Sequence, residues 1–216
     1  MKIAVINPNS TVSMTEKIAA AARAVAPFDD IVAITCHGSP AAIEGPEDDA
    51  ACRPFLLAEI ARAEREGADA AIIACFDDPA LEEARMGSGI PVLGIGQAGF
   101  HAAMLLGQRF SVVTTLPVAI PVIESNLARY GLAFACVRVR AAGVRVLDLE
   151  EPGGAAADKV SAEIGRARVE DGIGAVVLGC AGMADLVAGF AAEHGLRVID
   201  GVAAATALAR ALIALR

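Results

Sequence analysis

Two cysteines stand at equivalent places in two similar stretches of this chain. Residues 66–75 read EGADAAIIAC and residues 171–180 read DGIGAVVLGC, so Cys75 and Cys180 each end a short apolar run. They are 105 residues apart, close to half of the 216-residue chain. One thiol at the same place in each half of a duplicated chain predicts two thiols that face each other across a cleft. Such a pair could take a proton from one face of a carbon and return one to the other face, which inverts a stereocentre without a cofactor.

This chemistry requires one thiolate and one thiol at a time. A free thiol titrates at about 8.5, and a helix N-terminus lowers that value. Both cysteines precede expected helix starts, so the sequence predicts partial thiolate character near neutral pH. A lone cysteine at a strand end is usually an inert core residue, and we interpret Cys36, Cys52 and Cys136, which have no match in the other half, in this way. The matched positions favour catalysis for Cys75 and Cys180.

The elements that must position the two thiols also repeat. The runs at 2–7 and 109–114 correspond, and the runs at 91–94 and 197–200 correspond in the same way. Short apolar runs that alternate with helical stretches predict an α/β fold with parallel sheets. Strands are expected at 2–7, 31–36, 70–75, 91–95, 110–115, 134–140, 174–180 and 197–200.

We therefore expect two pseudo-symmetric halves, residues 1–97 and 98–216. Each should be a short, mostly parallel sheet flanked by helices, with the active site in the cleft between them. The C-terminal helix, about residues 203–216, is a candidate to pack back on the first half. The irregular loops at 37–52 and 141–155 are candidates to cover the site.

Polar residues follow several of the expected strands. Asn9 and Ser10 come after the first strand, and Thr114 and Thr115 end the strand that matches it. Ligands of open parallel sheets bind beyond the carboxyl ends of the strands. Amides and hydroxyls at these ends could therefore hold the oxygen of a developing enolate.

Two other motifs have simpler interpretations. Residues 94–99 fit the pattern GxGxxG, but no acid stands near 115–120 to bind a ribose, which favours tight turn packing over a dinucleotide site. Asp77 and Asp78 could be a metal pair or a base. Adjacent carboxylates tend to point apart, so we expect Asp78 to cap the helix that Pro79 would begin.

Composition excludes several classes of function. The formal net charge of −8 disfavours a nucleic-acid surface. The longest stretch without Asp, Glu, Lys or Arg, residues 86–108, is broken by Pro91 and several glycines, so no membrane span is expected. The five cysteines form no CxxC pair, which indicates reduced thiols in a cytoplasm and no zinc site.

Three segments together resemble the hydantoin/allantoin racemase branch of the aspartate/glutamate racemase superfamily. They are NPNST at 7–11, ACFDDP at 74–79 and LGCAGM at 178–183. The resemblance implies proton transfer by two thiols at a carbon next to a carbonyl, with no cofactor and no metal, in a homo-oligomer. By the same resemblance, Cys75 and Cys180 are the two bases. The residues that it places in the substrate pocket are Asn9, Ser10, Ile43, Phe76, Thr114, Thr115, Ala181 and Gly182.

The residues after the cysteines indicate the substrate class. Amino-acid racemases of the superfamily usually have Cys-Asn-Thr at the first cysteine and Gly-Cys-Thr at the second. Here Phe76-Asp77 and Ala181-Gly182 stand instead, so the groups that would hold an α-carboxylate and an ammonium are missing. A neutral ring such as a 5-substituted hydantoin, allantoin included, fits better. The alternatives are a maleate isomerase or arylmalonate decarboxylase on the same fold, and a non-catalytic protein that binds a small molecule.

Overall fold

The computed structural model describes residues 1–151 and 153–215. Pro152, inside the predicted cover 141–155, and Arg216, at the end of the predicted C-terminal helix, lie outside the described residues.

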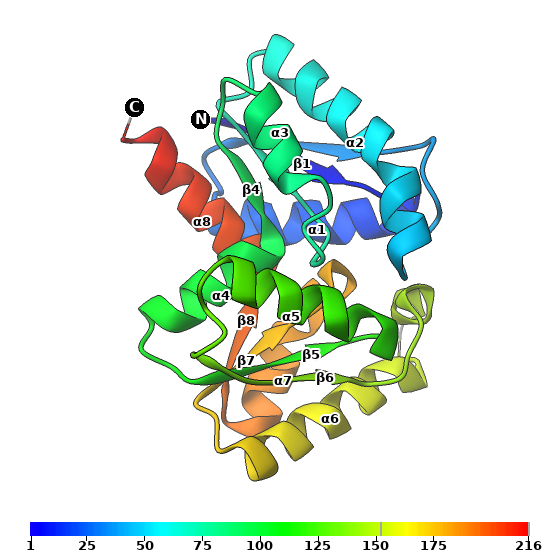
Figure 1. Cartoon of the computed structure of the whole chain (residues 1–216), viewed down its shortest axis with the longest axis vertical. Coiled ribbons are helices and arrows are strands. Elements are labelled where there is room, and N and C mark those ends of the chain that lie inside the picture. The colour runs from blue at the N-terminus through cyan, green and yellow to red at the C-terminus, as the bar shows by residue number, and fades with distance from the viewer. Residues whose placement is uncertain (152, 216) are drawn as a thin grey trace.

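The first half of the chain forms a four-stranded parallel sheet in the order β2-β1-β3-β4. Helices follow the first three strands, as Figure 1 shows in the upper part of the molecule. The elements are β1 (Lys2–Asn7), α1 (Val12–Val25), β2 (Asp30–Thr35), α2 (Pro46–Arg65), β3 (Ala70–Ile73), α3 (Leu81–Gly87) and β4 (Val92–Gly94).

The second half repeats this topology in the order β6-β5-β7-β8, again with parallel pairing throughout. Its strands are β5 (Phe110–Thr114), β6 (Cys136–Ala141), β7 (Ala175–Leu178) and β8 (Arg197–Asp200). Its helices are α4 (Ile95–Leu105), α5 (Ile120–Arg129), α6 (Ala155–Asp171), α7 (Val187–His194) and α8 (Gly201–Ile213). Short 3₁₀ turns lie at η1 (Pro117–Ala119), η2 (Val146–Glu150) and η3 (Ala181–Leu186). The predicted fold class is confirmed, and each predicted strand is found within two residues at either end.

Burial on both faces explains why the strands read as continuous apolar runs. Every residue of β3 and of β7 is buried, as expected when helices cover both sides of a parallel sheet. The inner faces of the two sheets share one core, in which Ile3 and Val5 of β1 belong to the same cluster as Phe110 and Val112 of β5. This shared core holds the two sheets in a fixed relation.

Helices α4 and α8 lie at the junction of the halves (Figure 1). Phe100 of α4 stacks on Phe110 with ring centroids 6.1 Å apart. The chain turns from β8 into α8 at Asp200, whose carboxylate accepts hydrogen bonds from the backbone N–H groups of Val202 and Ala203. Helix α8 then packs against α1 of the first half and against α4.

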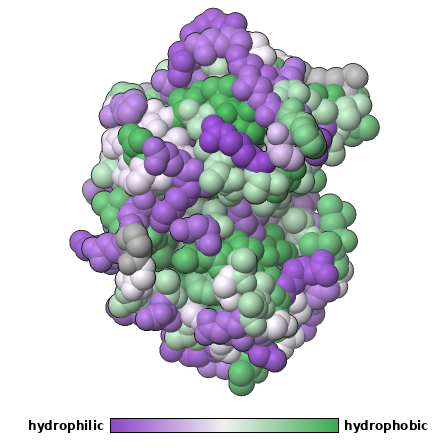
Figure 2. Space-filling view, turned by 180° about the vertical axis from the view of Figure 1, so that it is seen from behind, coloured by the Kyte–Doolittle hydropathy of each residue, from purple (hydrophilic) through white to green (hydrophobic). Residues whose placement is uncertain are grey.

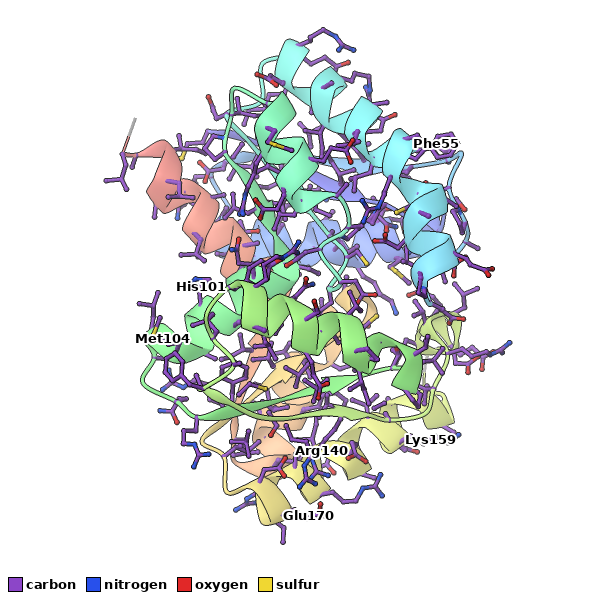
Figure 3. All side chains as sticks on the ribbon, viewed as in Figure 1. Phe55, His101, Met104, Arg140, Lys159 and Glu170 are labelled. Carbon is purple, nitrogen blue, oxygen red and sulfur yellow. The ribbon has the colours of Figure 1, made fainter. Side chains whose placement is uncertain are left out.

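A buried ion-pair network braces the outer side of the second half, remote from the junction (Figure 3). Arg140 of β6 donates to Glu163 at 3.0 Å, to Glu170 at 2.6 Å and to Asp171 at 2.7 Å, all on α6. Since every charge in the network is paired, its burial is compatible with a stable fold.

Candidate active site

One pocket lies between the two sheets, at the carboxyl ends of their central strands. Its empty space measures about 480 Å³, counted out to open solvent. Cys75 and Cys180 both line it, so the structure brings the two sequence-matched thiols into one site. The other lining residues are Asn9, Met14, Ile43, Glu44, Ala74, Phe76, Asp77, Thr114, Thr115, Leu116, Ala119, Val146, Gly179 and Ala181.

The two thiols sit on equivalent backbone. The residue before each cysteine continues the sheet, because Ala74 N–H donates to Ile6 and Gly179 N–H donates to Val113, both at 2.8 Å. A turn then follows in which the N–H three residues later bonds to the carbonyl of the cysteine, at 3.1 Å in both halves. The internal repeat of the sequence is thus a repeat of the local structure that carries each thiol.

A backbone N–H also points at each sulfur. The N–H of Asp77 donates to Cys75, and the N–H of Gly182 donates to Cys180. These donors stabilise a thiolate and act to lower the thiol pKa. The second residue after each cysteine therefore supports the sulfur through its main chain.

Both thiols are nevertheless held in the protonated form, which corrects the prediction of partial thiolate character. Burial raises the pKa of Cys180 to about 12. Burial, and then the neighbouring Asp77 carboxylate, raise the pKa of Cys75 well above its usual range. The helix effect is weak on the first side because α3 begins only at Leu81, and on the second side it comes from a short 3₁₀ turn.

Asn9 presents a fixed amide donor to the pocket. Its Oδ1 accepts hydrogen bonds from Asn7 Nδ2 at 2.8 Å and from the backbone N–H of Thr11 at 2.9 Å. Because a backbone N–H can only donate, the amide atom that faces Thr11 must be the oxygen. The amide nitrogen Nδ2 therefore faces Met14 Sδ, 3.1 Å away. A hydrogen of this amide remains for a ligand oxygen.

The two threonines differ in what their hydroxyls do. Thr114 Oγ1 donates to the carbonyl of Gly179 at 3.0 Å, which ties the end of β5 to the residue before Cys180. The carbonyl of Thr115 accepts from the N–H groups of Gly143 and Val144, so its backbone anchors the following loop. Thr114 thus uses its hydroxyl in a structural bond, whereas no hydrogen bond among the described residues engages the hydroxyl of Thr115.

Ser10 and Gly182 do not line the pocket, unlike the other predicted pocket residues. The N–H of Ser10 bonds to the carbonyl of Pro40, which ties this residue to the loop after β2. Gly182 contributes through its N–H toward Cys180. Phe76 lines the pocket, but its ring is buried and meets Phe100 edge-on at 5.3 Å, so much of it belongs to the core between the halves.

Two loops contribute residues to one side of the pocket, and both come from the stretches 37–52 and 141–155, which the sequence predicts to be irregular and to cover the site. The first stretch is a loop only up to Pro46, where α2 begins, and the second contains the 3₁₀ turn η2. Ile43 and Glu44 come from the first loop, and Val146 comes from the second. Glu44 Oε1 accepts a hydrogen bond of 2.6 Å from the N–H of Val146, 102 residues away in the chain. This bond joins the two loops across the boundary between the halves.

Asp78 does not cap the helix after it, contrary to prediction. The N-cap of α3 is Ala80, and the Asp78 carboxylate instead accepts from the N–H groups of Gly96 and Gln97, at 2.9 and 2.7 Å. It therefore caps α4. A Cβ on Gly94 would collide with this carboxylate, which explains the glycine-rich turn at 94–99 as a packing requirement and confirms the turn interpretation.

Sequence reasoning missed residues that reach the site from the opposite half. Asn126 Nδ2 of α5 donates to the carbonyl of Asp77 at 2.9 Å, and the Tyr130 hydroxyl donates to Asp78 at 2.9 Å. Lys17 of α1 donates to the carbonyl of Leu149 at 2.9 Å. None of these partners has a sequence signal, because each is defined by a contact across the interface.

Comparison with known proteins agrees with this geometry. The family model for the Asp/Glu/Hydantoin racemase matches residues 3–209. A hydantoin racemase of Rhizobium meliloti is 45% identical over 214 residues, which are 99% of this chain and 89% of that protein.

Solved structures give the same result. The allantoin racemase from Klebsiella pneumoniae has a TM-score of 0.96 and 42% identity, covering 100% of this chain and 88% of that one. The allantoin racemase from Pseudomonas fluorescens has a TM-score of 0.94 and 36% identity, covering 100% of this chain and 92% of that one. By its sequence, this chain belongs to the Asp/Glu/hydantoin racemase family.

Proposed function

We propose that this protein interconverts the enantiomers of 5-substituted hydantoins, allantoin included, by proton transfer at C5. The observation that carries the proposal is that Cys75 and Cys180 line one pocket on equivalent turns. The hydantoin and allantoin racemases among its relatives support the substrate class.

In the proposed reaction, the thiolate of one cysteine takes the C5 proton and becomes a thiol. The electron pair of the C–H bond moves into an enolate whose charge lies on the C4 oxygen. The thiol of the other cysteine then donates its proton to the opposite face of C5 and becomes the thiolate. Asn9 Nδ2 and the Thr115 hydroxyl are the donors that hold the enolate oxygen, a type of interaction that can contribute about 3 kcal/mol per donor.

The lining of the pocket favours a neutral substrate. Its described residues include no Lys, Arg or His, so no cation is in place to bind a carboxylate. Amino acids, malonates and maleate all carry such a group. A hydantoin ring instead offers amide N–H and C=O groups together with two flat faces.

The test is to incubate one enantiomer of a 5-substituted hydantoin with the protein in D₂O. We expect optical activity to decay to zero while deuterium appears at C5. Retention of optical activity and of the C5 proton across several hydantoins would overturn the proposal. A covalent mass shift with maleate, or CO₂ release from an arylmalonate, would assign one of the related activities in its place.

We further propose that the protein works in the cytoplasm as a homo-oligomer. All five cysteines are unpaired, as a reducing compartment would keep them. No helix among the described residues is long and apolar enough to cross a membrane. An apolar groove between α4 and α8 includes the exposed Leu105 and Leu212, and apolar areas also reach the surface in both halves on the face shown in Figure 2. Light scattering on the purified protein tests the oligomer, and a monomer would contradict it.

A further inference from the structure

Asp77 is a carboxylate in the pocket wall to which the proposed reaction gives no role. Among the described residues, no hydrogen bond or ion pair engages its carboxylate oxygens, whereas the neighbouring Asp78 accepts from Gly96, Gln97 and Tyr130. The backbone of Asp77 is fixed at both ends of the residue, by its N–H to Cys75 and by its carbonyl to Asn126. A rigid turn therefore presents an unpartnered carboxylate to the pocket.

The carboxylate lies near both thiols. All three side chains line the same pocket, and the charge of Asp77 raises the pKa of Cys75 and also that of Cys180. A flat ring held with one face toward each thiol presents its edges, and not its faces, to the other groups of the pocket wall. Asp77 is thus placed to meet the edge of the substrate and not a face.

The charge of Asp77 determines which edge that is. A half-buried carboxylate needs a hydrogen-bond donor, and the described pocket wall supplies it with no cation. On one side of C5 the ring carries the C4 carbonyl, where the enolate charge develops and a carboxylate would be repelled. On the other side it carries the nitrogen N1 with its hydrogen, which is a donor.

We propose that Asp77 recognises the substrate by accepting a hydrogen bond from the N–H next to the reacting carbon, and thereby selects cyclic ureides over substrates that carry a carboxylate. This inference rests on the proposed function and adds to it a specificity-determining contact. It orients the ring, with N1 toward Asp77 and the C4 oxygen toward the donors of Asn9 and Thr115.

The test compares one enantiomer of 5-benzylhydantoin with its N1-methyl and N3-methyl derivatives on the wild type and on Asp77→Ala. For the wild type, N1-methylation should lower kcat/KM about 10- to 100-fold, as expected for loss of a hydrogen bond to a charged group. N3-methylation should lower it by less than about threefold. For Asp77→Ala, kcat/KM on the parent compound should fall by a similar factor. This variant should no longer discriminate against the N1-methyl derivative, because it lacks both the carboxylate that accepts the N1 hydrogen bond and the bulk that would clash with the methyl group.

Two controls keep the result specific. Asp158→Asn removes a charge from the exposed start of α6 and should leave all three rates unchanged. Asp77→Asn, which keeps an oxygen acceptor, should give intermediate discrimination and provides the comparison if Asp77→Ala does not fold.

The inference is wrong if Asp77→Ala and Asp77→Asn keep the wild-type preference for the parent over the N1-methyl derivative. It is also wrong if N3-methylation is the more harmful change in the wild type. Either outcome leaves racemisation by the two cysteines intact. Failure of the wild type to racemise any hydantoin would instead remove the proposed function.

Discussion

The turn after Cys75 and the turn after Cys180 share their first hydrogen bonds but differ in their side chains and in the backbone that follows, which is left-handed at Asp78 and a 3₁₀ turn on the other side. Each carries a thiol at a strand end, a hydrogen bond from the third N–H to the cysteine carbonyl, and an N–H directed at the sulfur. On the first side the second residue after the cysteine is Asp77, and on the second side it is Gly182. The main chain thus gives both thiols the same support for proton transfer. The side chains make the surroundings of the two thiols different.

Each turn is also braced by the helix that follows the first strand of the opposite half. Helix α5 holds the first turn through Asn126 and Tyr130. Helix α1 holds the second side through Lys17, which pairs with Glu150 at 3.2 Å and with Asp185 at 3.6 Å. The bracing is reciprocal, with neutral donors on one side and a charged one on the other.

Removal of either thiol should have the largest effect on the racemisation rate. It should also show which enantiomer each cysteine deprotonates. Cys75→Ser and Cys180→Ser should each lower racemisation by at least about 10³-fold, because a serine hydroxyl is a far weaker acid than a thiol. Each variant should still exchange the C5 proton of the one enantiomer that its remaining cysteine faces. Deuterium incorporation measured separately for the two enantiomers checks this. A variant that racemises at a near-normal rate would show that its missing thiol is not a base.

The pH dependence of the rate should distinguish the two thiols. Since the pKa of Cys180 is about 12 and that of Cys75 is raised as well, kcat/KM should rise about tenfold per pH unit from 7 to 9 as the thiolate fraction grows. Asp77, whose pKa burial raises to about 7, ionises over the same range, and its charge is the main cause after burial that raises the pKa of Cys75. The rise should therefore be shallower for the enantiomer that Cys75 deprotonates. A plateau already at pH 7 for both enantiomers would mean that the thiolates form more easily than their burial allows.

Local pattern was sufficient to predict the strands and the paired cysteines. The apolar runs before Cys75 and Cys180 have the length of buried strands, and their carboxyl ends must meet at one edge of each sheet. The same reasoning placed Asn9 and Thr115 in the wall. These predictions need only the period of the sequence and the direction of parallel strands.

Contacts across the interface could not be predicted in this way. The sequence predicts that Asp78 caps the helix directly after it. In the structure its carboxylate instead accepts hydrogen bonds from the N-terminus of α4 and from the hydroxyl of Tyr130. The thiol pKa was misjudged for the same reason, since burial depends on how the halves close over the site. Glu44 reaches the pocket through a loop that carries no periodic signal.

The residue before each cysteine gives a third test of the comparison. Ala74 and Gly179 are equivalent, but a Cβ on Gly179 would lie 2.7 Å from Thr114 Cβ and 2.9 Å from Thr114 Cα. Gly179→Ala should therefore destabilise the fold by about 1–3 kcal/mol through overpacking, and should lower the rate because Cys180 follows directly. Ala74→Gly is the matched change and should cost only about 0.5–1 kcal/mol. Urea unfolding and kcat for both variants test this, and equal effects in the two halves would refute it.

The Asp77 carboxylate, which has no counterpart at Gly182, should lower the free energy of unfolding. Because the folded chain holds the pKa of Asp77 at about 7 against an ordinary value of 3.8, its ionisation favours the unfolded state as pH rises between these values. Asp77→Asn should therefore be more stable than the wild type by on the order of 2 kcal/mol at pH 8, with the shift discounted for partial exposure. The gain should shrink at pH 5 and vanish below pH 4. Urea unfolding at the three pH values measures it, with Asp158→Asn as the control, and a constant gain at all three would contradict this origin.

The smallest effect is expected at the bond that joins the two covering loops. Glu44→Ala removes the acceptor of the Val146 N–H, which lies 2.6 Å from Oε1, so the covered state loses one charge-assisted hydrogen bond while both thiols stay in place. KM should rise about five- to tenfold with kcat nearly unchanged, and Glu44→Gln, which keeps an oxygen acceptor, should recover most of the loss. Glu47→Ala, an exposed change in the first turn of α2, is the control. A fall in kcat as large as the rise in KM would mean that Glu44 acts on the chemistry of the thiols and not only on the closure of the loops.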